Sequence, residues 1–252
     1  MAINTDKNSY TIIFAVAMVV VVGSLLAFTA SSLKDKIDAN KRTEKQQNIL
    51  FAMGISDSED PNEFVAAEQA EELFNKYVGE EGQYIITGSV AKQTTEAFSI
   101  EVKKENDKVK QDPNYERKMP LFIGKKDGEE FYVVPMRGNG LWDAIWGYVS
   151  LDKEFKTVKG AFFDHKGETP GLGANIKEAY FRDDFIGERI LDASGNYKGI
   201  TVKKGNGDPK NVRKDDNAVD AMAGATITGD GVTAMVKKGI RMYQPYFETL
   251  KK

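Results

Sequence analysis

The segment Asp220-Ala-Met-Ala-Gly-Ala-Thr-Ile-Thr228 leads directly into an amphipathic helix pattern, and the interpretation of the whole chain starts from it. Apolar side chains recur after it at spacings of three and four, namely Val232, Met235, Val236, Ile240 and Tyr243. Thr226 and Thr228 follow small residues at 223–225, so nothing bulky shields their hydroxyls. Because a helix N-terminus presents unpaired N–H groups and a positive dipole end, a phosphate ester is favoured there. The alternative is an ordinary loop that ends in a helix N-cap.

An uncharged segment near the N-terminus predicts a membrane-spanning helix. No acidic or basic residue occurs from Thr11 to Leu33, and residues 12–22 are almost wholly apolar. About 20 such residues cross the roughly 30 Å hydrocarbon core of a bilayer. A cleaved signal peptide is the alternative, but its apolar core usually has only about 7–15 residues and a basic lead, whereas Lys7 stands alone here. We therefore expect a tail at 1–10 and a retained transmembrane helix at 11–33.

The charges around this segment do not decide which side of the membrane the remaining chain occupies. Lys34, Lys36, Lys41, Arg42 and Lys45 follow the segment, while Lys7 alone precedes it. A literal count of basic residues would keep the following domain in the cytoplasm, although large domains can be exported despite such charges.

Beyond the span, the pattern predicts a helical stalk at 34–60 and one soluble domain at 61–252. Helices are expected at 63–77 and 180–185, and a polar, exposed connection at 103–118. Strand composition occurs in seven segments, at 84–90, 98–102, 121–123, 131–134, 146–151, 157–163 and 199–202. The predicted class is α+β, with an antiparallel sheet and flanking helices tethered by a single transmembrane helix.

Composition excludes several classes of function. The 252 residues contain no cysteine and a single histidine, His165, which argues against thiolate-held iron–sulfur clusters, cysteine nucleophiles and multi-histidine metal sites. The net charge of −3 with mixed signs argues against nucleic-acid binding, for which a basic face is expected. We therefore expect neither a metal site nor a catalytic residue in this chain.

Two glycine-rich stretches precede the threonine segment. Residues 135–147 include Trp142 and Trp146, whose flat faces could wall an aromatic ligand, or equally fill a core behind a hairpin. Residues 165–173 read His-Lys-Gly-Glu-Thr-Pro-Gly-Leu-Gly, and their backbone could approach a ligand closely or form only a structural turn. This stretch is neither a P-loop nor a Rossmann fingerprint, because the spacing and endings differ.

The threonine segment resembles the flavinylation signature Asp-x-x-Ser/Thr-Gly-Ala-Thr-x-Thr of bacterial flavoproteins, which carry FMN in phosphoester linkage to the last threonine. The matching positions are Asp220, Gly224, Ala225, Thr226 and Thr228. One position departs from the signature, since Ala223 stands where Ser or Thr is usual. The resemblance implies that Thr228 is the attachment point and that a flavin transferase reads Asp220.

The order of motifs along the chain extends this resemblance. The apolar segment, Glu44–Leu50, Gly138-x-Gly-Leu-Trp142, Glu168-Thr-Pro-Gly-Leu-Gly173 and the threonine motif resemble the C subunit family of sodium-translocating NADH:quinone reductases. The resemblance implies that Thr226 supports the phosphate. It also implies a ring bounded by Trp142, Leu172 and the backbone of Gly171 and Gly173, with Glu168 and Thr169 at its polar edge. Trp146 remains a further candidate for the flavin site.

The same resemblance implies a place for the chain in a membrane complex. The soluble domain would lie on the periplasmic side of the bacterial inner membrane, together with subunits A, B, D, E and F. Its FMN would relay single electrons from an iron centre of subunits D and E to the FMN of the B subunit, during NADH oxidation, ubiquinone reduction and sodium export. Two alternatives stay open: the G subunit of the Rnf ferredoxin:NAD oxidoreductase complex, and a non-redox, membrane-tethered binding module.

Overall fold

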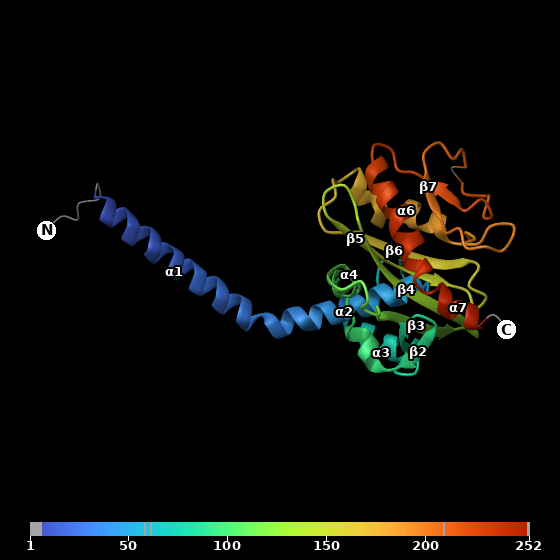
Figure 1. The fold of residues 1–252 in the computed structure, drawn as a ribbon, viewed down its shortest axis with the longest axis horizontal. Coiled ribbons are helices and arrows are strands. Elements are labelled where there is room, and N and C mark those ends of the chain that lie inside the picture. Colours follow the sequence, from blue (N-terminus) through green and yellow to red (C-terminus); the bar gives the residue numbers. More distant parts are fainter. Residues whose placement is uncertain (1–6, 58, 61, 209, 251–252) are drawn as a thin grey trace. The chain divides into compact units, whose positions relative to one another are not determined.

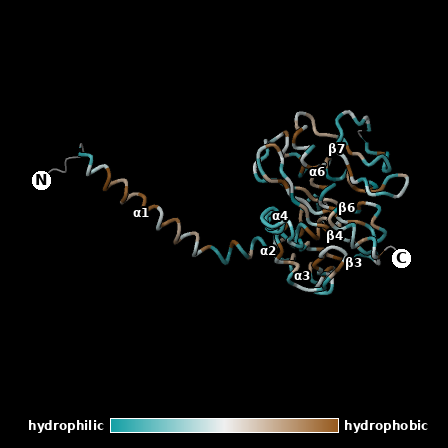
Figure 2. Tube along the Cα trace, in the orientation of Figure 1, coloured by the Kyte–Doolittle hydropathy of each residue, from teal (hydrophilic) through white to brown (hydrophobic). Residues whose placement is uncertain are grey.

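The computed structural model describes residues 7–57, 59–60, 62–208 and 210–250. They form two compact units, which divide between Lys45 and Gln46. The first unit contains helix α1 (Asn8–Ser32) and the beginning of helix α2 (Lys34–Ala52). Helix α1 has 25 residues, none of them buried, and a mean hydropathy of 2.7 in its most apolar window (Figure 2). The expected apolar helix is therefore present, and its length suits a bilayer; the tail expected at 1–10 lies mostly outside the described residues.

The second unit begins inside α2, earlier than the domain boundary expected at residue 61. The last part of α2 is buried, and Ile49, Leu50 and Met53 belong to an apolar cluster with residues of the sheet. Helix α3 (Ala67–Tyr77) adds Phe74 to the same cluster. The stalk expected at 34–60 is thus partly core, because its sparse apolar residues converge on one helix end.

A six-stranded antiparallel sheet forms the centre of the second unit (Figure 1). Its strand order is β2-β1-β3-β4-β5-β6, and every pair of neighbours is antiparallel. The strands are β1 (Gln83–Thr87), β2 (Val90–Gln93), β3 (Met119–Lys126), β4 (Glu129–Asn139), β5 (Ala144–Leu151) and β6 (Val158–His165). The predicted α+β class with an antiparallel sheet is confirmed.

The two faces of this sheet bury different clusters, as expected for side chains that alternate along each strand. On β5, Ile145 and Val149 lie in a cluster shared with helix α6 (Thr226–Arg241), while Tyr148 packs on the cluster of α2 and α3. We call these faces the α6 face and the α2 face. Helix α7 (Gln244–Leu250) also covers the α6 face, where Phe247 stacks on Phe155 at 4.1 Å between ring centroids.

The segment between β2 and β3 differs from the prediction. Where a strand was expected at 98–102 and an exposed connection at 103–118, the chain forms the 3-10 helix η1 (Thr95–Ser99) and helix α4 (Val102–Gln111). The buried carboxylate of Glu105 holds the segment after α4, because it accepts hydrogen bonds from the Tyr115 hydroxyl (2.9 Å) and the Lys118 N–H (3.0 Å). A polar side chain therefore fixes a helix that apolar periodicity alone does not reveal.

The chain after β6 forms short elements that lead to α6. They are η2 (Gly173–Lys177), α5 (Ala179–Arg182), η3 (Asp183–Phe185), β7 (Thr201–Lys203) and β8 (Ala218–Asp220). The helix expected at 180–185 corresponds to α5 and η3, and the strand expected at 199–202 corresponds to β7. The parallel pairing of β7 with β8 was not predicted.

Candidate functional site

The first turn of α6 contains both threonines of the predicted attachment motif. The helix begins at Thr226, so Thr228 is its third residue. Ala225 occupies the N-cap position and makes no side-chain capping hydrogen bond. Because the first N–H groups of a helix have no partner within the helix, this uncapped end favours an anion.

The Thr228 hydroxyl is hydrogen-bonded to the carboxylate of Glu168. Thr228 is only 1% exposed, and its Oγ1 donates to Glu168 Oε2 at 2.6 Å. The second carboxylate oxygen, Oε1, accepts the backbone N–H of Trp142 at 2.9 Å. Burial raises the pKa of Glu168, but the hydrogen bonds from the Thr228 hydroxyl and the backbone around Trp142 outweigh it and hold the pKa below its ordinary value. Glu168 is therefore ionised at neutral pH.

The contact between Glu168 and Thr228 requires glycine at two positions beside it. A Cβ at Gly173 would lie 2.4 Å from Thr228 Oγ1 and 2.5 Å from Glu168 Oε2. A Cβ at Gly140 would lie 2.5 Å from Glu168 Oε1. Any larger residue at either position would displace the carboxylate or the hydroxyl, so glycine at both positions is needed for their contact.

Exposed apolar side chains surround the start of α6. Leu141, Trp142, Leu172 and Ile227 are 47%, 69%, 41% and 57% exposed. Leu172 reaches the threonine motif, because a Cβ at Gly224 would lie 2.8 Å from its Cδ2. The indole N–H of Trp142 donates to Thr169 Oγ1 at 3.1 Å, which ties the two glycine-rich stretches together. An uncapped helix start beside an exposed apolar patch fits a ligand that has both a phosphate and a flat ring.

Most of the predicted site residues lie together. The structure connects the motif residues Gly224, Ala225, Thr226 and Thr228 with Glu168, Thr169, Gly171, Leu172, Gly173 and Trp142, through the contacts given above and through neighbouring positions in the chain. Gly171 and Gly224 have φ angles of +75° and +71°, the left-handed region that favours glycine. Asp220 ends β8, eight residues before Thr228, and is partly exposed.

Trp146 does not join this group. It pairs with Arg137 across β4 and β5, and the Arg137 guanidinium carbon lies 6.0 Å from its ring centroid. Its neighbours Ile145 and Gly147 point to the α6 face, so its own side chain points to the α2 face, away from α6. Of the two tryptophans offered as ring walls, the structure places only Trp142 near Thr228.

The two polar residues expected at a ring edge have other partners. Glu168 is buried against Thr228, and Thr169 accepts from the Trp142 indole. The roles of Leu141 and Ile227 in the exposed patch and of Gly140 in leaving space for Glu168 were not predicted from the sequence. The one sequence signal for them is that each lies next to a motif residue.

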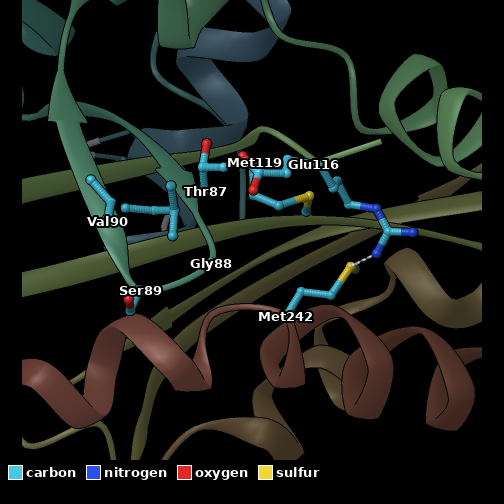
Figure 3. Close-up of a pocket in the computed structure, with 9 residues that line it drawn as sticks. Thr87, Gly88, Ser89, Val90, Glu116, Met119 and Met242 are labelled. Carbon is cyan, nitrogen blue, oxygen red and sulfur yellow. Dashed lines mark hydrogen bonds between the residues drawn. The ribbon is translucent and has the colours of Figure 1, made fainter. Parts of the chain in front are cut away.

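Among the described residues, several cavities lie outside this cluster. One of about 700 Å³ is lined by the β1–β2 turn, the residues before β3 and Met242, whose sulfur accepts from the Arg117 guanidinium (Figure 3). A second, of about 570 Å³, lies between α4 and α6 and reaches Gly138, Asn139 and Asp143 beside the Trp142 turn. Its basic lining residues are Lys103, Lys110, Arg117, Arg137 and Lys238. Neither cavity is lined by Thr228 or Glu168.

Comparison with known proteins identifies the family. A profile of the FMN-binding domain matches residues 140–241, which include the whole cluster around Thr228. The C subunit of the Na(+)-translocating NADH-quinone reductase from Vibrio parahaemolyticus is 30% identical over 241 residues, which cover 92% of this chain and 90% of the relative. This chain belongs to the C subunit family of these reductases. The corresponding protein of Haemophilus ducreyi is 29% identical over 98% of this chain and 96% of its own length.

Solved structures of the family share the fold. The crystal structure of the C subunit from Parabacteroides distasonis superposes with a TM-score of 0.70 at 30% identity, covering 85% of this chain and 96% of that chain. The protein is thus a flavoprotein subunit of an oxidoreductase, with an FMN-binding domain and one apolar helix suited to membrane anchoring.

Proposed function

We propose that this chain carries FMN in phosphoester linkage to Thr228 and relays single electrons within a Na+-translocating NADH:quinone reductase. The supporting observation is the Thr228 hydroxyl in an uncapped helix turn, inside the region that the FMN-binding profile matches. When bound, FMN supplies the one-electron redox chemistry, and the protein supplies attachment, orientation and electrostatics.

The residues around Thr228 divide these tasks. The N–H groups of the first α6 turn, together with the Thr226 hydroxyl, hold the phosphate. Trp142 and Leu172 bound the ring, and the backbone at Gly171 and Gly173 approaches it closely. Asp220 lies outside this contact set and serves recognition by the flavin transferase.

The proposed place in the complex follows from the family. The relatives of this chain are named as C subunits, which supports membership of a multi-subunit complex, and we propose subunits A, B, D, E and F as its partners. Electrons pass from an iron centre of subunits D and E to this chain and on to the FMN of the B subunit, and this chain has no NADH or quinone site of its own. The alternative, the G subunit of the Rnf complex, is less well supported, because the reductase relatives match over nearly their whole length.

We further propose that α1 anchors the chain in the bacterial inner membrane with the FMN domain on the periplasmic side. The chain contains no cysteine, so a single exposed cysteine reports its side without background. The Ala193→Cys variant should react with a membrane-impermeant maleimide in intact spheroplasts. Reaction only after lysis would place the domain in the cytoplasm.

The attachment site is tested by substitution of Thr228. We expect Thr228→Ala to lose all flavin fluorescence in a denaturing gel, because it has no acceptor oxygen, while the purified chain stays folded. Thr228→Ser keeps a hydroxyl and should keep the fluorescent band, and Thr249→Ala in α7 serves as a remote control. A fluorescent band in the denatured Thr228→Ala chain would overturn the proposed attachment.

A further inference from the structure

The Glu168–Thr228 contact brings an ionised carboxylate to the atom that would be esterified. Thr228 Oγ1 has one proton, and it lies in the 2.6 Å hydrogen bond to Glu168 Oε2. Forming a phosphoester on Oγ1 requires this proton to leave. Both residues are more than nine-tenths buried, so the carboxylate meets the hydroxyl with little competition from water.

The surroundings of Glu168 keep it aimed at Thr228. Its other oxygen is held by the Trp142 N–H, and the Glu168 N–H itself donates to His165 Nδ1 at 3.1 Å. The absence of a Cβ at Gly140 and Gly173 allows both oxygens to approach their partners. A carboxylate that only stabilised the turn at 141–143 would need one oxygen there, whereas the other oxygen of Glu168 accepts a hydrogen bond from the Thr228 hydroxyl.

We propose that Glu168 is the base that accepts the Thr228 proton as the flavin phosphoester forms, an inference that rests on the proposed function. The flavin donor is FAD, in which the flavin phosphate is joined to a nucleoside monophosphate by one phosphoanhydride bond, presented by a flavin transferase. Thr228 Oγ1 bonds to the flavin-side phosphorus, and the bridging P–O bond breaks. The nucleoside monophosphate leaves with the bonding pair, the proton passes to Glu168 Oε2 and then to solvent, and no atom changes oxidation state.

The helix position assists the same step. Negative charge that develops on Oγ1 lies in the first turn of α6, near the positive end of the helix dipole. Because Thr228 is almost fully buried, the donor phosphorus reaches Oγ1 only after part of its cover moves. Leu172 is exposed and lies over Gly224, so displacement of its loop would uncover the start of α6 while Glu168 stays held by the Trp142 N–H.

The test measures flavin incorporation into the purified full chain lacking flavin, with flavin transferase and FAD, as initial rates at several pH values. Glu168→Gln keeps the size and one acceptor oxygen but removes the base, so its rate should fall at least about 100-fold, the usual lower range for general base catalysis. The ratio of wild-type to variant rates should shrink as pH rises, because hydroxide replaces the missing base. Glu178→Gln, which removes an exposed carboxylate five residues beyond Gly173, should stay within about twofold of wild type.

The outcomes separate the inference from the function on which it rests. A wild-type chain that takes no flavin on Thr228 contradicts the proposed function. A wild-type chain that takes flavin while Glu168→Gln matches its rate, or is slowed by one constant factor at every pH, overturns only the role as base. If Glu168→Gln does not fold, Glu168→Asp decides: its carboxylate is withdrawn from Oγ1, so a rate equal to wild type would overturn the inference.

Discussion

The two faces of the central sheet bury apolar cores of different size and different polar groups. On the α2 face, Phe74, Phe98 and Phe122 meet edge to face at 5.4 to 6.3 Å between ring centroids, and the buried hydroxyl of Ser150 donates to the Ala52 carbonyl oxygen. The α6 face has the larger apolar core, and it also buries the Glu168–Thr228 pair, in which a carboxylate meets a hydroxyl. Buried polar groups are expensive unless they have partners. The α2 face therefore uses a buried hydroxyl to bind the end of helix α2, whereas the buried carboxylate of the α6 face contacts the hydroxyl of the predicted attachment residue.

The largest expected effect comes from a pair of Gly→Ala substitutions, one on each face of the sheet. A Cβ at Gly231 in α6 would lie 2.3 Å from the Asn139 carbonyl oxygen, and a Cβ at Gly160 in β6 would lie 2.4 Å from that of Ala52. Both Gly→Ala changes should lower the free energy of unfolding by about 1–3 kcal/mol, because backbone must move. Only Gly231→Ala shifts the first turn of α6, so it alone should lose covalent flavin.

Urea unfolding and in-gel flavin fluorescence of the two variants measure these effects side by side. Alanine normally improves an exposed helix interior by up to about 1 kcal/mol over glycine, so a stabilised Gly231→Ala would show that the clash relaxes freely. Equal flavin loss in both variants would remove the distinction between the faces.

A smaller effect concerns pH and Glu188. This side chain is completely buried, and loss of hydration raises its pKa to about 7, from an ordinary value of 4.5. Between these values the folded chain binds more protons than the unfolded chain, so stability falls as pH rises from about 4.5 to 7. One pKa unit corresponds to about 1.4 kcal/mol, so over this pH range the loss of stability should be roughly 3 kcal/mol.

Chemical denaturation of wild type and Glu188→Gln across this pH range checks the assignment. The variant should show a flatter profile, since it has no proton to lose. A wild-type profile that rises over the same range, or a variant profile parallel to it, would mean that Glu188 does not control this dependence.

The smallest expected effect contrasts the two tryptophans. Trp142→Ala should change stability by less than about 0.5 kcal/mol, because the side chain is exposed, but should increase flavin fluorescence by removing a quenching indole. Trp146→Ala should leave the flavin spectrum unchanged and lose its stacking with Arg137, worth about 0.5–1 kcal/mol. A flavin spectrum that responds to Trp146 and not to Trp142 would reverse the assignment of the faces.

The sequence predicted the parts of the fold whose signal is local. Strand composition located most of the sheet, and spacings of three and four located α6. It missed α4, because its anchor is the buried carboxylate of Glu105 and not an apolar stripe. It also treated the end of α2 as stalk, because burial of Ile49 and Leu50 depends on a sheet formed much later in the chain.

For the candidate site, too, the sequence indicated local features and missed contacts between distant residues. The motif drew attention to Thr228, and the resemblance favoured Trp142 as a ring wall while keeping Trp146 as a further candidate. Within one strand, residues four positions apart point to the same face of the sheet. Strand β5 begins at Ala144, so Trp146 lies in the strand while Trp142 lies in the turn before it, and the two side chains need not share a face. The contact of Glu168 with Thr228 joins residues sixty positions apart, and no spacing rule predicts it.

The most direct test of the central claim is a mass measurement on the chain purified from its own host. Peptide mapping of the native chain should find the segment that contains Thr228 heavier by one FMN less one water, with the fragment ions assigning the added mass to Thr228. An unmodified mass for that segment in all of the purified chain, or the added mass on Thr226, would contradict the account.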